Sequence, residues 1–110
     1  MFPKKNRADK KAIEKVFKKG TFVGCGVLGL KYLIEDKSIP LRISFVVPKT
    51  VEKKAVRRNF LKRKGYIVLK KHWNKIPEGF LGVFLFNKNQ KTEKLSGKIE
   101  EDIKNILNKI

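Results

Sequence analysis

Acidic side chains are scarce in this sequence. Only 10 of the 110 residues are Asp or Glu, against 28 Lys and Arg, and the formal net charge is +18. Self-repulsion on this scale opposes a compact chain, so the composition indicates a polyanionic partner. Nucleic acid is the first candidate and an anionic membrane surface is the second.

Cysteine, histidine and long apolar runs are also nearly absent. One cysteine cannot form an intrachain disulfide, and one cysteine with one histidine cannot build a Cys/His metal site. The amino terminus lacks the apolar core of a signal peptide, and no stretch reaches the roughly 18 apolar residues of a spanning helix. We therefore expect a cytoplasmic protein that is neither exported nor inserted into a membrane and that has no metal site of its own.

The remaining composition is that of a folded domain. Hydrophobic residues make up 41% of the chain and aromatic residues 10%, which is too apolar for charge-driven disorder. A chain of this length builds one modest core, and it has neither repeats nor an interdomain linker. We expect residues 1–110 to form a single domain.

Periodicity predicts six or seven secondary-structure elements. The first is a short helix from Asp9, a suitable N-cap, to Lys19, with Gly20 as its stop. The glycine-containing segment 21–35 predicts a strand that bends or divides in two, and segment 41–48 a strand antiparallel to it. The others are a helix from about 51 to 72, a buried strand at 80–87 and a last helix at 95–110. The pattern predicts an α+β fold, a two-layer sandwich in the order α-β-β(-β)-α-β-α.

The helix expected at 51–72 divides into two sides. With 100° per residue, polar and aromatic side chains gather on one arc, which we expect to be presented. Its members are Arg58, Asn59, Lys62, Arg63, Tyr66 and Lys70. Apolar residues gather on the broad opposite side, which we expect to pack. Its members are Val56, Phe60, Leu61, Ile67 and Val68. Gly65 favours a kink or an early end.

The presented arc is typical of an RNA-binding surface. Its cations lack acidic partners at helical spacing, although a merely solvated helix face usually mixes both signs. Arg binds phosphate through two parallel hydrogen bonds, Lys adds point charge, and an aromatic ring can stack on an unpaired base. Tyr66 is equally compatible with a buried ring whose hydroxyl is satisfied. The combination suits structured RNA better than sequence reading in a DNA groove.

No group of residues indicates that the protein itself performs catalysis. A protein nuclease needs carboxylates gathered around metal ions or a general acid and base near the substrate. Most of the ten acidic residues instead fall in expected turns, caps or exposed helix ends. We expect no catalytic residue and no metal ligand in this chain.

Several segments together resemble the protein component of bacterial ribonuclease P. These are "FPKKNR" near the start, "VFKKG" at the end of the first helix, "ISFVVPKTVEKKAVRRNFLKR", and "GFLGVFLFNK". The central signature is Ala-Val before Arg-Asn with Lys-Arg three residues further on, here Ala55, Val56, Arg58, Asn59, Lys62 and Arg63. An Asn at a fixed place within a basic helix is not expected from charge alone, which makes this signature specific.

The resemblance implies a subunit that binds a catalytic RNA and the 5′ leader of precursor tRNA and promotes endonucleolytic 5′ maturation. The protein would be part of an endoribonuclease whose RNA subunit hydrolyses the substrate with bound magnesium. It would bind no cofactor alone and would be a monomer within the ribonucleoprotein. The implied fold is ribosomal-protein-S5-domain-2-like, with a left-handed β-α-β crossover. A small ribosomal or RNA-assembly protein without a processing role is the alternative.

The resemblance also assigns residues, and the chain departs from the family pattern at some of them. The implied RNA-binding residues are Lys49, Lys53, Lys54, Arg57, Arg58, Asn59, Lys62 and Arg63. The implied leader cleft is bordered by Ile13, Phe17 and Tyr66. Phe60 and Tyr66 stand where the family usually has Arg, and Ile13 stands where an aromatic residue often lines the cleft.

Overall fold

The computed structural model describes residues 6–25, 28–86 and 92–109, with the backbone alone for residues 25 and 92–96. The elements are α1 (Lys10–Lys19), β1 (Thr21–Cys25), β2 (Leu28–Ile34), β3 (Arg42–Val46), α2 (Ala55–Lys71), the 3₁₀ turn η2 (Trp73–Lys75), β4 (Phe80–Phe86) and α3 (Thr92–Lys109). The expected α+β order is confirmed, and segment 21–35 is divided into two strands. Residue 87 of the expected fourth strand and residue 110 of the last helix lie outside the described residues.

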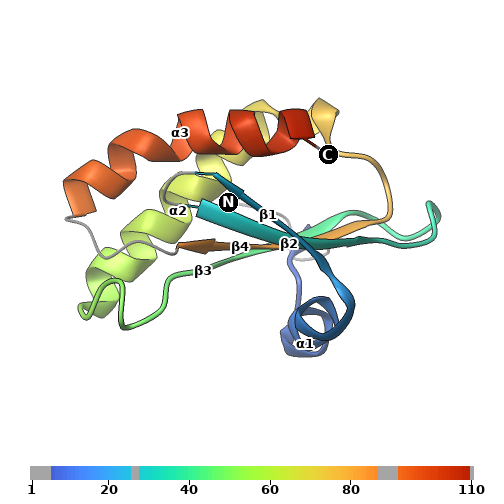
Figure 1. Cartoon of the computed structure of the whole chain (residues 1–110), viewed down its shortest axis with the longest axis horizontal. Coiled ribbons are helices and arrows are strands. Elements are labelled where there is room, and N and C mark those ends of the chain that lie inside the picture. The colour runs from blue at the N-terminus through green and yellow to red at the C-terminus, as the bar shows by residue number, and fades with distance from the viewer. Residues whose placement is uncertain (1–5, 26–27, 87–91, 110) are drawn as a thin grey trace.

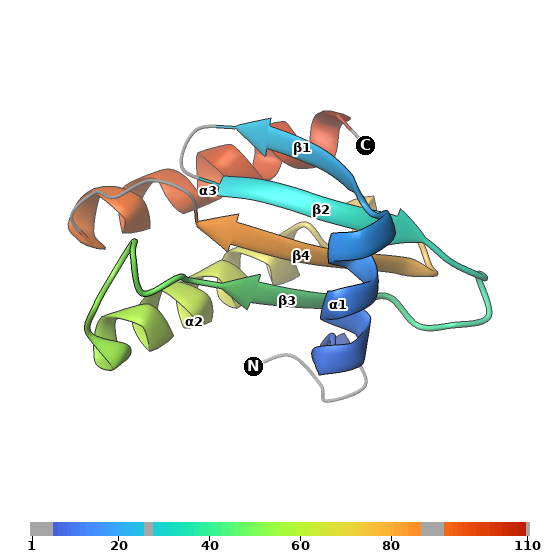
Figure 2. The same cartoon turned by 60° about the horizontal axis from the view of Figure 1, so that its bottom comes forward.

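The four strands form a mixed sheet in the order β1-β2-β4-β3 (Figure 2). β2 pairs antiparallel with both β1 and β4, whereas β3 pairs parallel with β4. Segment 41–48 therefore runs antiparallel to β2, as expected, but it pairs with β4 and not with a strand of segment 21–35. The reason lies in β4, whose sequence FLGVFLF is apolar at nearly every position and is buried along most of its length. Such a strand belongs in the centre of a sheet, and it separates β2 from β3.

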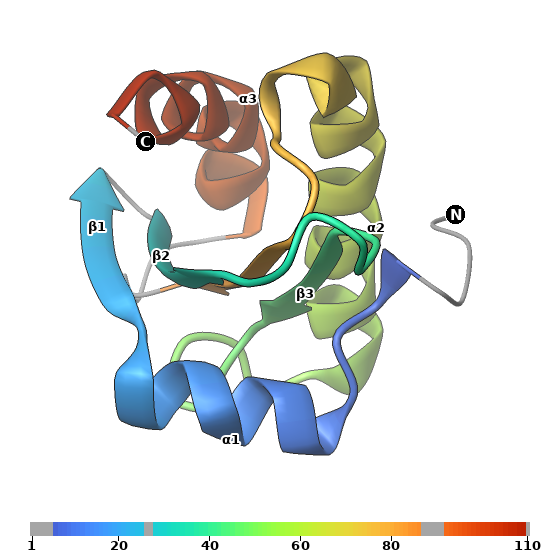
Figure 3. The same ribbon diagram turned by 90° about the vertical axis from the view of Figure 1, so that its right-hand side faces the viewer.

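Helices cover both faces of the sheet, so the predicted two-layer arrangement is also wrong. α1 lies against one face, while α2 and α3 lie against the other (Figures 1 and 3). On the α1 side, Val16 packs with Leu81 and Val83 of β4. On the other side, Phe80 and Phe84 of the same strand belong to the larger core. Because alternate residues of β4 point to opposite faces and both sets are apolar, each face needs its own cover.

The first helix begins and ends where the sequence predicts. A carboxylate oxygen of Asp9 accepts a hydrogen bond from the Ala12 N–H at 2.8 Å, as an N-cap does. The Gly20 N–H donates to the Val16 carbonyl at 2.7 Å and closes the last turn. Ala12 and Val16 are buried, and Phe17 is 41% exposed.

The packing of α2 differs from the prediction in two respects. Its buried residues are Leu61, Gly65, Val68 and Leu69. Leu61 and Val68 were expected there, but the other three predicted packing residues, Val56, Phe60 and Ile67, are exposed. The helix also continues through Gly65 to Lys71 without an early end. A Cβ atom on Gly65 would lie 2.6 Å from Cε1 of Phe45, so glycine is what lets the helix approach β3 at this point.

The last helix packs on the same side of the sheet as α2. Ile99, Ile103, Ile106 and Leu107 are buried in the larger core, at the spacing expected for one apolar face. Within the described ranges, no helix is long and apolar enough to cross a membrane.

Candidate nucleic-acid interface

A basic loop leads into α2, and Arg58 holds it in place. The Arg58 Nη1 donates hydrogen bonds to the carbonyl oxygens of Glu52 at 3.0 Å and Lys53 at 2.7 Å. The loop itself is closed by the Val51 N–H, which donates to the Pro48 carbonyl at 2.9 Å. Arg58 is half-buried as a result. Its side chain therefore organises the entrance to the helix as well as adding positive charge.

Cations gather where α2 begins, at the end of the helix that already carries positive partial charge. The first turn contains no acidic residue, and the N-cap residue Lys54 makes no side-chain hydrogen bond to the helix. The exposed cations around this end are Lys49, Lys53, Lys54 and Arg57. Cations beside a helix N-terminus are unfavourable, and an anion placed there would relieve the repulsion.

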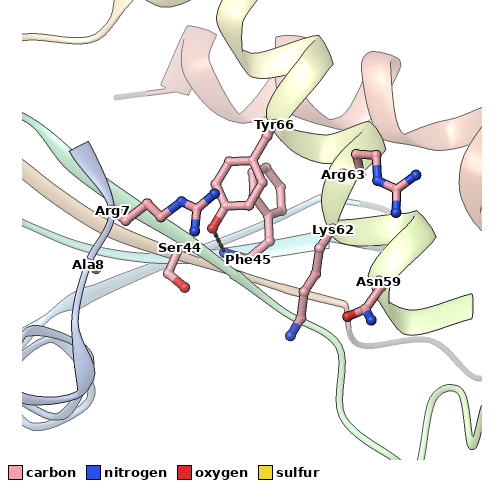
Figure 4. A pocket seen from close by; sticks show the side chains of 8 residues that line it. All are labelled: Arg7, Ala8, Ser44, Phe45, Asn59, Lys62, Arg63 and Tyr66. Atoms are coloured by element: carbon pink, nitrogen blue, oxygen red, sulfur yellow. Dashed lines mark hydrogen bonds between the residues drawn. The ribbon is translucent and has the colours of Figure 1, made fainter. Parts of the chain in front are cut away.

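The segment before α1 supplies a further cation. It runs along the free edge of β3, where Arg7 forms a parallel bridge with Ile43. The Ala8 N–H donates to the Ile43 carbonyl at 3.3 Å, and the buried Asn6 Nδ2 donates to the Leu41 carbonyl at 2.8 Å. These bonds hold the segment on β3, and the side chain of Arg7 points toward α2 (Figure 4). The helix α1, which follows Arg7 in the sequence, covers the opposite face of the sheet.

A pocket of about 470 Å³ lies between this segment, β3 and α2 (Figure 4). It is lined by Arg7, Ala8, Ser44, Phe45, Asn59, Lys62, Arg63 and Tyr66. None of these lining residues is acidic, and three of them, Arg7, Lys62 and Arg63, are basic. The pocket can therefore hold an anionic group and surround it with hydrogen-bond donors from segments that are far apart in the sequence.

Tyr66 forms one wall of the pocket and is tied to the sheet. Its hydroxyl accepts a hydrogen bond from the Phe45 N–H at 3.3 Å, and its ring meets the Phe45 ring edge to face at 4.9 Å. The guanidinium carbon of Arg7 lies 6.0 Å from the centre of the Tyr66 ring. Tyr66 thus has the satisfied hydroxyl of a structural residue, while its ring borders the basic pocket.

A family model described as Ribonuclease P matches residues 2–110. The chain belongs to the ribonuclease P protein family. Solved structures agree with this assignment. One structure of the RNase P protein of Staphylococcus aureus has 20% identity, covers 91% of this chain and 89% of that chain, and has a TM-score of 0.75. A second has 22% identity, 98% and 92% coverage, and a TM-score of 0.73. The Thermotoga maritima protein has 25% identity, 89% and 90% coverage, and a TM-score of 0.72. A comparison with curated proteins gives no match.

Membership in the ribonuclease P family establishes the role that the sequence predicted. The chain is a component of a ribozyme-based endoribonuclease and acts in the 5′ maturation of tRNA, with the ribonuclease P RNA and precursor tRNA as partners. This decides against the alternative of a ribosomal or assembly protein without a processing role.

The structure brings together only some of the predicted RNA-binding residues of this ribonuclease P protein. Asn59, Lys62 and Arg63 line the pocket, whereas Arg58 bonds to the entrance loop. Lys49, Lys53 and Lys54 lie on or beside that loop, and Arg57 is exposed on α2 outside the pocket lining.

Sequence reasoning missed Arg7 and Ser44 as pocket residues. Arg7 ends the "FPKKNR" segment that carried part of the family resemblance. However, nothing local links it to the pocket residues of α2, which lie more than fifty residues away in the sequence. Only the pairing of its segment with β3 places it opposite α2.

Of the three residues predicted for the leader cleft, only Tyr66 lines the basic pocket. Ile13 is half-buried and packs against the core cluster beneath α1. Phe17 is exposed, with the Lys31 Nζ 5.4 Å from its ring centre and 3.4 Å from its backbone oxygen. Tyr66 lies in the basic pocket described above, whose lining includes neither Ile13 nor Phe17.

Among the described residues, no group of three or more His, Cys, Asp or Glu side chains is placed to hold a metal ion. The clearest role of an acidic residue is structural. Glu35, at the end of β2, accepts hydrogen bonds from the Lys15 Nζ at 2.5 Å and the Arg42 Nη2 at 2.6 Å. The Lys15 bond, together with that from Arg42, holds the pKa of Glu35 below its ordinary value despite the opposing effect of desolvation. This ion-pair cluster ties α1 to the sheet.

Proposed function

We propose that the pocket beside α2 and the loop leading into the helix form the contact with the ribonuclease P RNA. The observation that carries the proposal is the meeting of cations from separate segments around a pocket with no acidic lining residue. The proposed contact residues are Lys49, Lys53, Lys54, Arg57, Arg58, Asn59, Lys62 and Arg63, with Arg7 added from the geometry.

The side chains of the pocket have complementary chemistry for this purpose. Arg7 and Arg63 each carry a planar guanidinium that can bind a phosphate through two hydrogen bonds, and Lys62 adds a mobile point charge. The Asn59 amide both donates and accepts hydrogen bonds, so it can bond to a base edge or to a 2′-hydroxyl. Lys and Arg only donate and therefore do not distinguish these groups from a phosphate. Arg57 lies outside the pocket lining and contributes charge to the surroundings.

We further propose that the 5′ leader of precursor tRNA runs over the α1 side of the sheet. The exposed ring of Phe17 offers a stacking surface, and Lys31 stands over the same ring to meet the backbone charge. Ile13 packs against the core cluster on the same face of the sheet, and Tyr66 borders the basic pocket on the other side of β3, where a continuing strand would meet the RNA contact.

The remaining features that the family resemblance implies are also proposals. The chain is one RNA-binding domain over residues 1–110, acts in the cytoplasm without a membrane partner, and is a monomer within the ribonucleoprotein. Magnesium acts with the RNA subunit, which performs the hydrolysis, and no residue of this chain is catalytic. The connection from β3 through α2 to the parallel strand β4 is the left-handed crossover of a ribosomal-protein-S5-domain-2-like fold, which the parallel pairing of those strands supports.

The salt dependence of RNA binding tests the proposed contact. Lys62→Ala and Arg63→Ala should each weaken binding to the cognate RNA and lower the slope of log affinity against log salt by about one, because each cation neutralises a phosphate. Lys104→Ala, at an exposed lysine of α3, is the matched control and should change neither. Slopes that stay the same in the two pocket variants would place the RNA contact elsewhere.

Reconstitution tests the role of the contact in processing. The protein should raise cleavage of precursor tRNA by its cognate RNA at low magnesium, and Lys62→Ala should reduce that increase. High magnesium should restore cleavage, because hydrolysis belongs to the RNA. A Lys62→Ala protein that stimulates cleavage fully at low magnesium would contradict the proposal.

A further inference from the structure

A second pocket lies at the end of the sheet where β2 ends and β4 begins. Its volume is about 410 Å³, within the range of roughly 300 to 1,000 Å³ that is usual for ligand sites. None of the residues that line it is acidic, and none of them lines the basic pocket beside α2. We name it the β2–η2 pocket. Its lining includes Tyr32 and Ile34 of β2, Asn74, Lys75 and Ile76 at η2, and Phe80 of β4.

Backbone hydrogen bonds hold together the segments that form this pocket. The Glu35 N–H, directly after β2, donates to the Gly79 carbonyl at 2.7 Å, and the Ile76 N–H donates to the Trp73 carbonyl at 3.1 Å. The chain after β2 and the chain before β4 therefore run side by side at this end of the sheet (Figure 3). A ligand would meet walls whose backbone is already in place, which lowers the entropic cost of binding.

The pocket has a buried apolar floor and an exposed apolar wall. Phe80 and Ile76 are 1% and 7% exposed and form the floor. The Phe80 ring stacks on the ring of Tyr32, with the ring centres 5.4 Å apart. Gly82 lies opposite Tyr32 in the sheet and leaves room for this stack, because a Cβ there would lie 2.6 Å from Cε1 of Phe80. Ile34, 64% exposed, supplies the wall.

Three polar side chains line the same pocket without a hydrogen-bond or ion-pair partner among the described residues. They are the Tyr32 hydroxyl, the Asn74 amide and the Lys75 ammonium group. Two acidic residues are close in the sequence. Glu35 is already bonded within the ion-pair cluster described above, and Glu78 does not line the pocket. The polar groups are therefore available to a ligand.

An unpaired nucleotide matches this combination of groups. A nucleobase that is not paired exposes two apolar faces and an edge of hydrogen-bond donors and acceptors. Its faces suit the fixed ring of Tyr32 and the side chain of Ile34, and its edge suits the Asn74 amide, which both donates and accepts. Lys75 can meet the negative charge of the attached phosphate.

Other occupants use only part of the pocket. A free inorganic anion would meet Lys75 but not the apolar wall and floor. An apolar side chain of a partner protein would use the wall and floor but none of the three polar groups. The chain has a net charge of +18 and belongs to a family whose partners are RNA molecules, which also favours a nucleotide.

We propose that the β2–η2 pocket binds one unpaired nucleotide of an RNA partner, with its base against Tyr32 and Ile34, its edge on Asn74 and its phosphate on Lys75. Both the ribonuclease P RNA and precursor tRNA can supply such a nucleotide. The pocket shares no lining residue with the proposed contact beside α2, and the proposal does not depend on that contact.

A short RNA tests the proposal on the full chain. The probe is a fluorescently labelled oligomer of about six uridines, and the control is an oligomer of the same length and charge that lacks the bases. Fluorescence anisotropy should show tighter binding of the uridine oligomer to the parent protein. The double variant Ile34→Ser, Asn74→Ala should bind the uridine oligomer at least about fivefold more weakly and the control oligomer as the parent does.

Further variants separate the base contact from charge. Ile67→Ser is the matched control, because Ile67 is also exposed, at 55%, but lines neither pocket. It should bind both oligomers as the parent does. Lys75→Ala should weaken both oligomers alike and lower the slope of log affinity against log salt by about 0.7. Thermal unfolding checks the fold of each variant.

Cross-linking gives a measurement that needs no variant. An oligomer that contains 5-iodouridine should become attached to Tyr32 of the parent protein on irradiation, and mass spectrometry of the peptides identifies the residue. The lack of a cross-link at Tyr32 would contradict the proposal.

Binding of the two natural RNAs identifies the source of the nucleotide. Weaker binding of the ribonuclease P RNA by the double variant would assign the nucleotide to that RNA. Weaker binding of precursor tRNA by the assembled holoenzyme alone would assign it to the precursor. No loss with either RNA would overturn the proposal and would leave an apolar side chain of a partner protein as the occupant.

Two results with the oligomers would also overturn the proposal. The first is unchanged affinity of the double variant for the uridine oligomer. The second is an equal loss of affinity for both oligomers, which would show an effect of charge and not a base contact. Parent-like RNA binding by Lys62→Ala would instead refute only the contact beside α2, because Lys62 does not line this pocket.

Discussion

Replacing Gly65 by alanine should destabilise the protein, although the same change in an exposed helix usually stabilises it. The added Cβ would lie 2.6 Å from Cε1, 2.8 Å from Cδ1 and 2.9 Å from Cζ of Phe45. That ring cannot move aside easily, because it is buried, stacks on Phe84 with ring centres 4.9 Å apart, and meets Tyr66 edge to face. Either the Phe45 ring or α2 must shift.

The expected magnitude follows from two opposing effects. Alanine is favoured over glycine inside a helix by about 1 kcal/mol. Overpacking a tightly packed core costs about 1 to 3 kcal/mol. The net loss in the free energy of unfolding is therefore about 0 to 2 kcal/mol. Gly97→Ala is the matched control, since Gly97 lies in α3 and, among the described residues, nothing beyond its own stretch of helix comes within 4 Å of its added Cβ. That variant should gain about 1 kcal/mol.

Thermal and denaturant unfolding of the two variants measure the difference directly. We expect Gly97→Ala to raise the melting temperature by about 4 °C or more and Gly65→Ala to leave it unchanged or lower it. Gly65→Ala should also weaken RNA binding, because Phe45 and Tyr66 line the pocket. Equal stabilisation by both substitutions would refute the close packing of α2 on β3.

Three further predictions concern the loops and the ion-pair cluster. Because the pKa of Glu35 is lowered, its contribution to stability is fully present above the ordinary value of 4.5 and is lost as the pH falls through the folded-state pKa. Glu35→Gln should therefore reduce the loss of stability that the parent protein shows as the pH falls through this range. An unchanged loss of stability in the variant would contradict the role of the cluster. Arg58→Lys keeps the charge but loses the hydrogen bonds to the carbonyl oxygens of Glu52 and Lys53, so chemical denaturation should show a free energy of unfolding lower by about 1 kcal/mol or more. Stability equal to that of the parent protein would mean that the loop does not need these two hydrogen bonds. Gly79→Ala places a side chain on a backbone with φ of 79°, and its Cβ would lie 2.4 Å from the carbonyl oxygen of Glu35. The substitution should therefore lower the free energy of unfolding by more than about 1 kcal/mol in the same assay. A smaller loss would argue against this backbone conformation at Gly79.

Local signals in the sequence predicted the elements well. Asp9 and Gly20 bound the first helix as expected because capping depends on hydrogen bonds between residues three or four apart. The apolar run of β4 likewise predicted a buried strand. The pairing of β3 with β4 could not be predicted from such local signals, because it depends on where in the sheet the chain places the strand that follows α2.

The sequence by itself determined that the chain is a basic α+β protein, that it carries the signature of a ribonuclease P protein, and in which order its helices and strands follow, because charge, motif and periodicity are local properties. It also selected Asn59, Lys62 and Arg63, which the pocket gathers. Only the tertiary structure decided which side of α2 is buried. The helix is apolar on two sides, so periodicity alone could not choose between them, and the approach of Gly65 to Phe45 settles the choice. The same packing brings Arg7 opposite α2 and leaves Val56, Phe60 and Ile67 exposed, because those positions depend on contacts between segments that the sequence keeps far apart.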